Sequence, residues 1–322
     1  MNVRFYKGMT AVAIAATMAL GGAVPALAVE GTRSVAVQYK TSNGTTSPAE
    51  TVTYTKTSSE VTDGTAQTAP ELTVTGVSYA KDSATAAGYT QDVVLHFADT
   101  DTPGVYTYTL TPSYSDPTQA GLVTDNDTLT VKYTVYYGTD RNLTTAVAIR
   151  KGSSTTKLSA DTPIVMQFNT GNLDVSKSVQ GNLGDKTKEF DITVTLNRAE
   201  GATYGTTYTV TGDTDNANTT ITAGGSATFH LHNGEHVQIA NLPNGMTYTV
   251  TEGAYEGYTS HVSDPTAIST GDTKTVTVTN TKNGTIDTGV FLNNAPYLAI
   301  LGGVGAAAII VINRRRHAND ED

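Results

Sequence analysis

The sequence contains no cysteine and no tryptophan, and only 16% of its 322 residues are charged. A chain without cysteine cannot form disulfides, so an exported form needs some other means of stabilisation. The formal net charge is −10, and nothing in the sequence indicates the basic face that nucleic-acid binding requires. The sequence also lacks a glycine-rich phosphate loop, a serine nucleophile elbow and a cysteine–histidine pair, so the common enzyme motifs are missing.

The sequence is rich in threonine, valine, tyrosine and glycine, a composition that favours strands and turns over helices. From about residue 50, short runs of alternating apolar and polar residues are separated by Gly, Asn, Asp and Pro. Examples are ETVTYTK at 50–56, LTVKYTVYY at 129–137 and TVTVTN at 275–280. Many short strands at this spacing predict an all-β chain built from immunoglobulin-like β-sandwiches.

The runs fall into two series, which predict two tandem β-sandwich domains. Each series starts with a strand of the pattern apolar-x-apolar-x-Lys and ends with a strand that carries or precedes Asn. We place the N-terminal domain at 29–171 and the C-terminal domain at 172–283. The polar segment TSNGTTSPA at 41–49 is interpreted as a leader or loop before the first series.

Residues 1–28 have the form of a secretory signal peptide. Arg4 and Lys7 precede a run of apolar and small residues, and ALA at 26–28 offers a small-x-small cleavage site. A membrane anchor that stays attached is the alternative, but the run is short and the cleavage site is well formed. Cleavage is therefore predicted between Ala28 and Val29.

The other end of the chain, 284–322, carries a second targeting segment. Residues 295–312 contain no charged residue and are just long enough for a membrane-spanning helix. Three arginines at 314–316 follow, as a cytoplasmic stop follows a span. A buried core helix is the alternative, which the position at the chain end beside the arginines disfavours. The segment is predicted to anchor the precursor in the membrane.

The C-terminal series places three polar side chains in apolar rows. Side chains alternate with period two along a strand, so Lys177 falls on the apolar face of LDVSKSV at 173–179. By the same count, Glu252 falls on the apolar face of TYTVTE, and Asn280 on that of TVTVTN. A buried lysine without a partner is strongly destabilising. Three such residues of complementary chemistry therefore indicate a site.

These three side chains suit amide formation. Burial disfavours charge, so it lowers the pKa of a lysine and raises that of a glutamate. A neutral amine is a nucleophile, and the side-chain carbonyl of Asn280 is an electrophile. A protonated Glu252 between them could polarise that carbonyl and carry the proton to the departing ammonia. The product would be an isopeptide bond from Lys177 to Asn280.

The segments around these residues resemble the isopeptide-linked CnaB-type domain of Gram-positive pilins, and in particular streptococcal major backbone pilins. The resemblance covers essentially the whole chain and is strongest over 172–316. It implies that Lys177 is the amine, Asn280 the acceptor and Glu252 the catalytic acid. The alternative is a surface lysine and asparagine without a bond.

The N-terminal series departs from this pattern. Lys56 has the alternation expected of the family's lysine, but Pro112 stands where the family has its glutamate. Thr170 occupies the expected acceptor position and Asn169 comes one residue early, which a β-bulge could correct. A second isopeptide bond between Lys56 and Asn169 stays open, and we expect the domain to lack one.

The segment TIDTGV at 285–290 resembles a sortase sorting signal of LPxTG type, with Thr288 and Gly289 matching and Thr285 and Ile286 departing from Leu-Pro. The resemblance implies that a sortase cleaves between Thr288 and Gly289 and retains Thr288 as an acyl-enzyme.

Relatives then join Thr288 to a lysine near the end of the first domain of the next subunit. Lys157 is the best candidate and Lys151 the second, although either could be an ordinary surface lysine. The YPK motif of other pilin classes is absent.

Three histidines, His230, His232 and His236, lie within FHLHNGEH at 229–236. A His-x-His pair on a strand can bind metal, but alternation turns Phe229 and Leu231 inward and these histidines outward. We therefore predict no metal site and no cofactor.

These features predict a structural protein, the shaft subunit of a covalent cell-surface pilus, rather than an enzyme with external substrates. The expected partners are sortase, identical subunits, accessory pilins, peptidoglycan and, for adhesion, the host surface, with no nucleic acid. The alternative is a monomeric wall-anchored adhesin that uses the same domains as a stalk or binding module.

Overall fold

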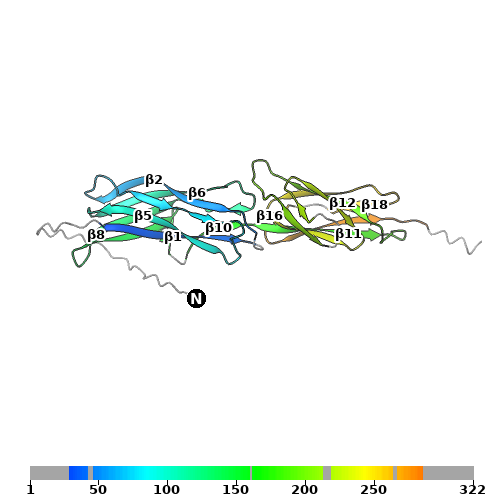
Figure 1. Cartoon of the computed structure of the whole chain (residues 1–322), viewed down its shortest axis with the longest axis horizontal. Coiled ribbons are helices and arrows are strands. Elements are labelled where there is room, and N and C mark those ends of the chain that lie inside the picture. The colour runs from blue at the N-terminus through cyan, green and yellow to red at the C-terminus, as the bar shows by residue number, and fades with distance from the viewer. Residues whose placement is uncertain (1–28, 43–45, 160–161, 213–218, 264–266, 286–322) are drawn as a thin grey trace, which may run out of the picture.

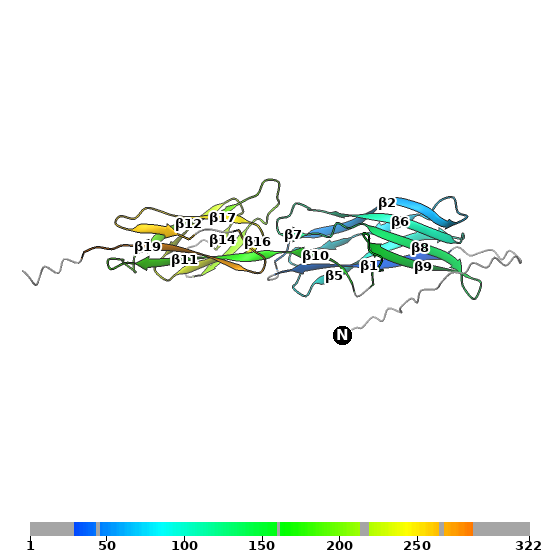
Figure 2. The same cartoon turned by 180° about the vertical axis from the view of Figure 1, so that it is seen from behind.

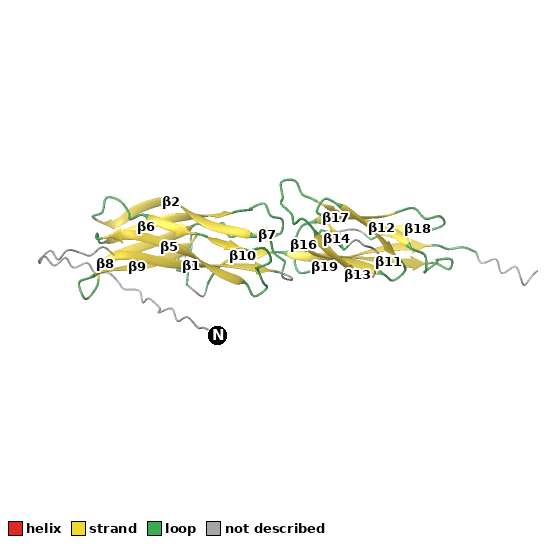
Figure 3. Ribbon diagram, viewed as in Figure 1, coloured by secondary structure: helices red, strands yellow, loops and turns green. Residues whose placement is uncertain are grey.

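The computed structural model describes residues 29–42, 46–159, 162–212, 219–263 and 267–285. Within these ranges the regular structure is all β-strand and no helix occurs (Figure 3), so the predicted all-β fold is confirmed. The described residues accordingly contain no helix with the length and apolarity of a membrane span. The predicted signal peptide, the membrane segment and all of the sorting motif except Thr285 lie outside them.

The first ten strands form one β-sandwich, called here the first sandwich. Its sheets have the strand orders β3-β5-β1-β10-β7 and β4-β2-β6-β8-β9. Side chains from both sheets fill one core that is unusually rich in tyrosine. The strands are β1 (Val29–Thr41), β2 (Glu50–Gly64), β3 (Leu72–Thr75), β4 (Val77–Tyr79), β5 (Tyr89–Thr100), β6 (Gly104–Tyr114), β7 (Leu122–Val123), β8 (Leu129–Tyr137), β9 (Leu143–Lys151) and β10 (Ile164–Phe168).

The first sandwich contains a strand that precedes the first alternating series. We expected the first series to begin near residue 50, but β1 precedes it. Val35, Val37 and Tyr39 alternate with exposed or half-buried residues and are themselves buried, as in any other strand of the core. Lys56 therefore lies on β2, the second strand, and not on the first strand of its sandwich.

The remaining nine strands form the second sandwich. Its sheets have the orders β14-β13-β16-β11-β19-β18 and β15-β12-β17, with a separate core between them. The strands are β11 (Thr170–Gln180), β12 (Phe190–Asn197), β13 (Tyr208–Gly212), β14 (Thr220–Ile221), β15 (Ser226–Leu231), β16 (His236–Pro243), β17 (Thr247–Glu252), β18 (Thr259–Val262) and β19 (Thr273–Thr281).

In both sandwiches the first and last strands are parallel neighbours. β1 pairs with β10, and β11 pairs with β19. Because parallel strands run the same way, the chain enters each sandwich at one end and leaves at the other. The two described ends of the chain consequently lie at opposite ends of an elongated molecule (Figure 1).

The two sandwiches are stacked end to end, as both views show (Figures 1 and 2). Only Asn169 separates β10 from β11, so the chain passes almost without interruption from one sandwich to the other. Across the junction, the Ala120 amide donates to the Thr203 carbonyl at 2.8 Å. Gly121 has a φ of +79°, and a Cβ there would lie 2.6 Å from the Asn169 carbonyl oxygen, so this close approach requires glycine.

Candidate functional site

The second sandwich buries a lysine in its core. Lys177 lies on β11, between β16 and β19, and is only 2% exposed. Leu173, Val175 and Val179 on the same face are also buried, as the alternation predicts. A lysine is rarely found in such a position without a partner.

Its partner is Glu252, the last residue of β17 in the opposite sheet. The Lys177 Nζ donates to Glu252 Oε1 at 2.6 Å, and both side chains are at most 1% exposed. The carboxylate therefore bridges the two sheets. Burial lowers the pKa of Lys177, and the hydrogen bond to Glu252 partly offsets that effect. The amine is thus shifted toward its neutral, nucleophilic form.

Asn280 lies on β19, beside the strand that carries Lys177. Lys177 is paired with Val278 and Val179 with Asn280, so Lys177 and Asn280 are diagonal neighbours on the same face. Asn280 is fully buried, and neither its Oδ1 nor its Nδ2 has a hydrogen-bond partner in the described part of the chain. Burying an unpaired amide is unfavourable. As a purely non-covalent core, the site is incomplete.

Aromatic rings surround the lysine. The Lys177 Nζ lies 4.2 Å from the ring centroid of buried Phe190, a cation–π distance. Tyr255 and Tyr258 meet Phe190 edge to face, with centroids 4.8 and 5.4 Å away. The rings shield the amine from water, which explains why burial is the main cause of its lowered pKa.

Ser260 also belongs to this site, although the sequence did not point to it. Its Oγ donates to Glu252 Oε2 at 2.6 Å, so each carboxylate oxygen has its own donor. Ser260 lies on the short strand β18, whose four residues are exposed or half-buried and show no clear alternation. No sequence signal could have identified it, because its role depends on which strands are neighbours.

The candidate pair of the first sandwich is not brought together in the same way. Lys56 lies on β2 in one sheet, and its Nζ donates to Glu71 at 2.6 Å. Asn169 follows β10, in the other sheet, and its backbone bonds Gly121 and Asn244 at the junction. Pro112, at the position where the family has its glutamate, lies on β6 opposite Tyr54, and Leu110 is opposite Lys56.

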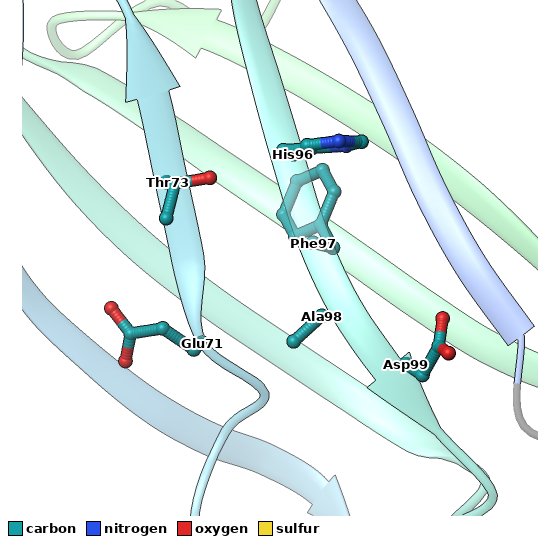
Figure 4. Close-up of a pocket in the computed structure, with 6 residues that line it drawn as sticks. All are labelled: Glu71, Thr73, His96, Phe97, Ala98 and Asp99. Atoms are coloured by element: carbon teal, nitrogen blue, oxygen red, sulfur yellow. The ribbon is translucent and has the colours of Figure 1, made fainter.

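Glu71 borders a shallow surface pocket beside β3 and β5 (Figure 4). Thr73 and His96 lie next to each other on these strands, and Phe97, Ala98 and Asp99 complete the lining. Two of the polar groups at this pocket have partners, since Glu71 pairs with Lys56 and His96 with Thr32. The pocket therefore adds no obvious reactive group to the Lys56 region.

Tyr39 and Phe168, called here the register counterparts of Lys177 and Asn280, have the same pairing relation in the first sandwich. Tyr39 pairs with Met166, as Lys177 pairs with Val278, and Phe168 lies two residues beyond Met166, as Asn280 lies beyond Val278. Both counterparts are buried, and neither can form an amide.

The two candidate inter-subunit lysines differ in their surroundings. Lys151 forms ion pairs with Asp125 and Asp127, and the hydrogen bond to Asp125 raises its pKa, which keeps it protonated. Lys157 is exposed beyond the end of β9 and forms no ion pair within the described residues. Of the two, Lys157 is the more accessible amine.

The histidines of the second sandwich lie at its surface, while Phe229 and Leu231 are buried. His230 Nδ1 lies 2.5 Å from Asp191 and 3.6 Å from Glu189, and these three groups are close enough to share an ion. His232 contacts Glu235, and His236 contacts Asp174. Each imidazole thus has a carboxylate neighbour.

Ala28, Thr288 and Gly289 lie outside the described residues, and Val29 is the first residue of β1.

The architecture of two stacked sandwiches is that of a major pilin. The fold matches the crystal structure of a single-site mutant of the major pilin from Streptococcus pyogenes with a TM-score of 0.50. That match covers 79% of this chain and 99% of the pilin at 23% sequence identity, which shows a shared fold.

The sequence is also similar to that of a pilin from Streptococcus pyogenes serotype M1. The two are 28% identical over 244 residues, covering 67% of this chain and 68% of the pilin. A shorter stretch of 89 residues is 36% identical to the pilus tip adhesin Cpa of Streptococcus pyogenes, covering 28% of this chain and 12% of the adhesin. Residues 171–282 match a family model described as a domain of unknown function, DUF7601. The predicted resemblance to streptococcal backbone pilins is confirmed.

Proposed function

We propose that this chain is a structural shaft subunit of a cell-surface pilus, with sandwich domains at 29–171 and 172–283. The observation that carries the proposal is the buried set of Lys177, Glu252 and Asn280 in the second sandwich. Similarity to a streptococcal pilin along two-thirds of both chains supports it. In this proposal the set reacts once, during folding, and thereafter cross-links the subunit.

The reaction starts from the Lys177 ammonium and the Glu252 carboxylate, 2.6 Å apart. One proton passes from Nζ to Oε1, and the neutral Nζ attacks Cγ of Asn280. Protonated Glu252 stabilises the developing charge on Oδ1 and relays protons to Nδ2. The Cγ–Nδ2 bond then breaks. The ammonium and the amide become an isopeptide bond and an ammonium ion, and Glu252 is regenerated as a carboxylate.

The bond removes both unfavourable features of the buried site. The buried cation of Lys177 becomes an uncharged amide nitrogen, and the unpaired primary amide of Asn280 is consumed. It also supplies the cross-link that a chain without cysteine cannot obtain from disulfides.

Assembly in this proposal uses the C-terminal segment 284–322. A sortase cleaves between Thr288 and Gly289, and the acyl group on Thr288 is transferred to Lys157 of the next identical subunit. The exposure of Lys157 and the ion pairs of Lys151 favour the first lysine over the second. The last subunit is passed to peptidoglycan, and accessory pilins complete the fibre.

Intact mass tests the internal bond directly. Residues 29–288 of the wild type should be lighter than their sequence by one ammonia molecule, and Glu252→Ala should have the full sequence mass. A deficit of two ammonia molecules would show that Lys56 also reacts. No deficit in the wild type would contradict the proposed bond.

Polymer formation tests whether the chain is a shaft subunit that is joined to identical subunits through Lys157. Cells that express the chain with its sortase should yield a ladder of SDS-resistant multimers, which Lys157→Ala should reduce to the single subunit. Lys151→Ala is the matched control and should leave the ladder intact. A ladder that survives Lys157→Ala and disappears with Lys151→Ala would reverse the assignment.

A wall-anchored monomeric adhesin is the second candidate function. The 89-residue similarity to a pilus tip adhesin favours it, since such modules are not confined to shaft subunits. A single wall-released band in the same experiment, without multimers, would support this alternative.

A further inference from the structure

The second carboxylate oxygen of Glu252 is held by a residue outside the reacting set. Oε1 accepts from Lys177, and Oε2 accepts from the hydroxyl of Ser260, each at 2.6 Å. Among the described residues these are the two hydrogen-bond donors of this carboxylate. A buried carboxylate with two fixed donors has a single orientation.

The two donors flank the strand of the acceptor. β19, which carries Asn280, lies between β11 with Lys177 and β18 with Ser260. Glu252 comes from the opposite sheet. Its carboxylate therefore receives one hydrogen bond from each of the two strands that flank β19. This geometry holds the carboxylate in the region of the Asn280 amide.

Register places Ser260 next to Asn280. The two residues are directly opposite each other in the antiparallel pair of β18 and β19. Directly opposite side chains point to the same face, with Cβ atoms about 4.5–5.5 Å apart. Ser260 thus faces the buried amide, although its own strand is at the exposed edge of the sheet.

The two hydrogen bonds have different fates if the proposed reaction occurs. The one from Lys177 changes when Nζ gives up its proton and again when Nζ becomes an amide nitrogen. The one from Ser260 takes no part in bond making or breaking. It is therefore the contact that can hold Glu252 in place from the first proton transfer to the release of ammonia.

We propose that Ser260 is a positioning residue for isopeptide formation, which aims Glu252 at Lys177 and Asn280 throughout the reaction. This inference rests on the proposed function, because it requires the bond to form. It assigns no chemical step to Ser260. The hydroxyl acts by fixing the orientation of the carboxylate, as preorganised donors do in enzyme sites.

The test is the rate of bond formation in newly made full-length chain. Cell-free synthesis is pulse-labelled, stopped in SDS at intervals and digested, and mass spectrometry quantifies the linked peptides that contain Lys177 and Asn280. Rates are expressed per folded chain, measured by circular dichroism. Ser260→Ala should slow linkage about tenfold, the loss expected for one hydrogen bond to a charged group. Its final yield should still approach that of the wild type.

Two variants separate positioning from a general effect on folding. Ser260→Thr keeps the hydroxyl and should restore most of the rate. Thr259→Ala makes a similar truncation at the preceding residue, which points to the other face, and should match the wild type. Equal rates for Ser260→Ala and the wild type would overturn the inference and leave the bond intact. A slow Ser260→Thr would also overturn it, whereas absence of linkage in the wild type would overturn the proposed function itself.

Discussion

The two sandwiches share a plan and differ in chemistry. Each places its first and last strands side by side, and each buries one glutamate, Glu50 in the first and Glu252 in the second. Within the described residues, Glu50 Oε1 accepts from neutral donors, namely Ser115 and the amides of Thr51 and Asp116. Glu252 accepts from an amine. A buried carboxylate therefore becomes a candidate acid–base group only when the neighbouring residues supply a nucleophile and an acceptor.

The two sandwiches should differ most in stability when the buried glutamate of each is replaced, in separate variants, by glutamine. Glu252→Gln should abolish the ammonia deficit and strongly destabilise the second sandwich. The variant cannot form the cross-link, which encloses about 100 residues and should contribute about 5 kcal/mol to stability through loop entropy. It also leaves the buried Lys177 ammonium without a carboxylate, which should cost a further 3–5 kcal/mol, roughly. Intact mass and denaturant unfolding measure both effects.

Glu50→Gln is the matched control in the first sandwich. Its amide oxygen can still accept from the same neutral donors, so the cost should be about 1–2 kcal/mol and the mass deficit should be unchanged. Equal losses of stability for both variants would mean that the two carboxylates have the same role.

The next largest effect is expected from a variant that removes the cross-link alone. Asn280→Ala removes the acceptor but keeps the pair of Lys177 and Glu252, so the second sandwich should lose about 5 kcal/mol. For a sandwich of this size, its calorimetric transition should fall by about 20 °C or more, while that of the first sandwich stays in place. Asn283→Ala, at an exposed position, should shift neither transition.

This contrast also explains what the sequence could predict. Strand alternation placed Lys177, Glu252 and Asn280 in the core, because each occupies the next inward position of an otherwise apolar row. The same alternation occurs in β1, before the series that starts near residue 50, so a comparison of Lys56 with Lys177 matches a second strand to a first strand. Alternation shows which way a residue points but not which strands are neighbours. Ser260 could therefore be recognised only from the pairing of β18 with β19.

Alkaline pH should weaken the first sandwich more than the second. Burial raises the pKa of its core tyrosines above the usual value of 10, and that of Tyr114 to about 12. Above about pH 10 the unfolded chain loses phenolic protons that the folded chain keeps, so stability falls as pH rises. Apart from Tyr106, each such tyrosine should lower the free energy of unfolding by about 1 kcal/mol one pH unit above 10. The residues concerned are Tyr39, Tyr54, Tyr79, Tyr106, Tyr108 and Tyr114.

In the second sandwich, the tyrosines whose pKa burial raises are Tyr208 and Tyr255. Between about pH 9 and pH 11, the calorimetric transition of the first sandwich should therefore fall further than that of the second, which has fewer such tyrosines. A larger shift in the second sandwich would contradict this account of the two cores.

The smallest effect is expected at the counterpart of the reactive lysine. Tyr39→Phe removes only the hydroxyl that donates to the Pro48 carbonyl at 3.3 Å, a long hydrogen bond worth about 1 kcal/mol or less. Lys177→Met, at the register counterpart of Tyr39, should prevent the cross-link and lose all of its stabilisation. Urea unfolding of both variants compares them directly, and similar losses would argue against the proposed bond.

The parallel register of the first and last strands has a consequence for how far the fibre could stretch. A bond from Lys177 to Asn280 would close residues 178–279 into a loop that tension cannot draw out, although those residues would span about 350 Å if extended. Tyr39 and Phe168 offer no such closure in the first sandwich. Each subunit would then combine a segment of fixed length with one that can unravel under load and refold when the load is released.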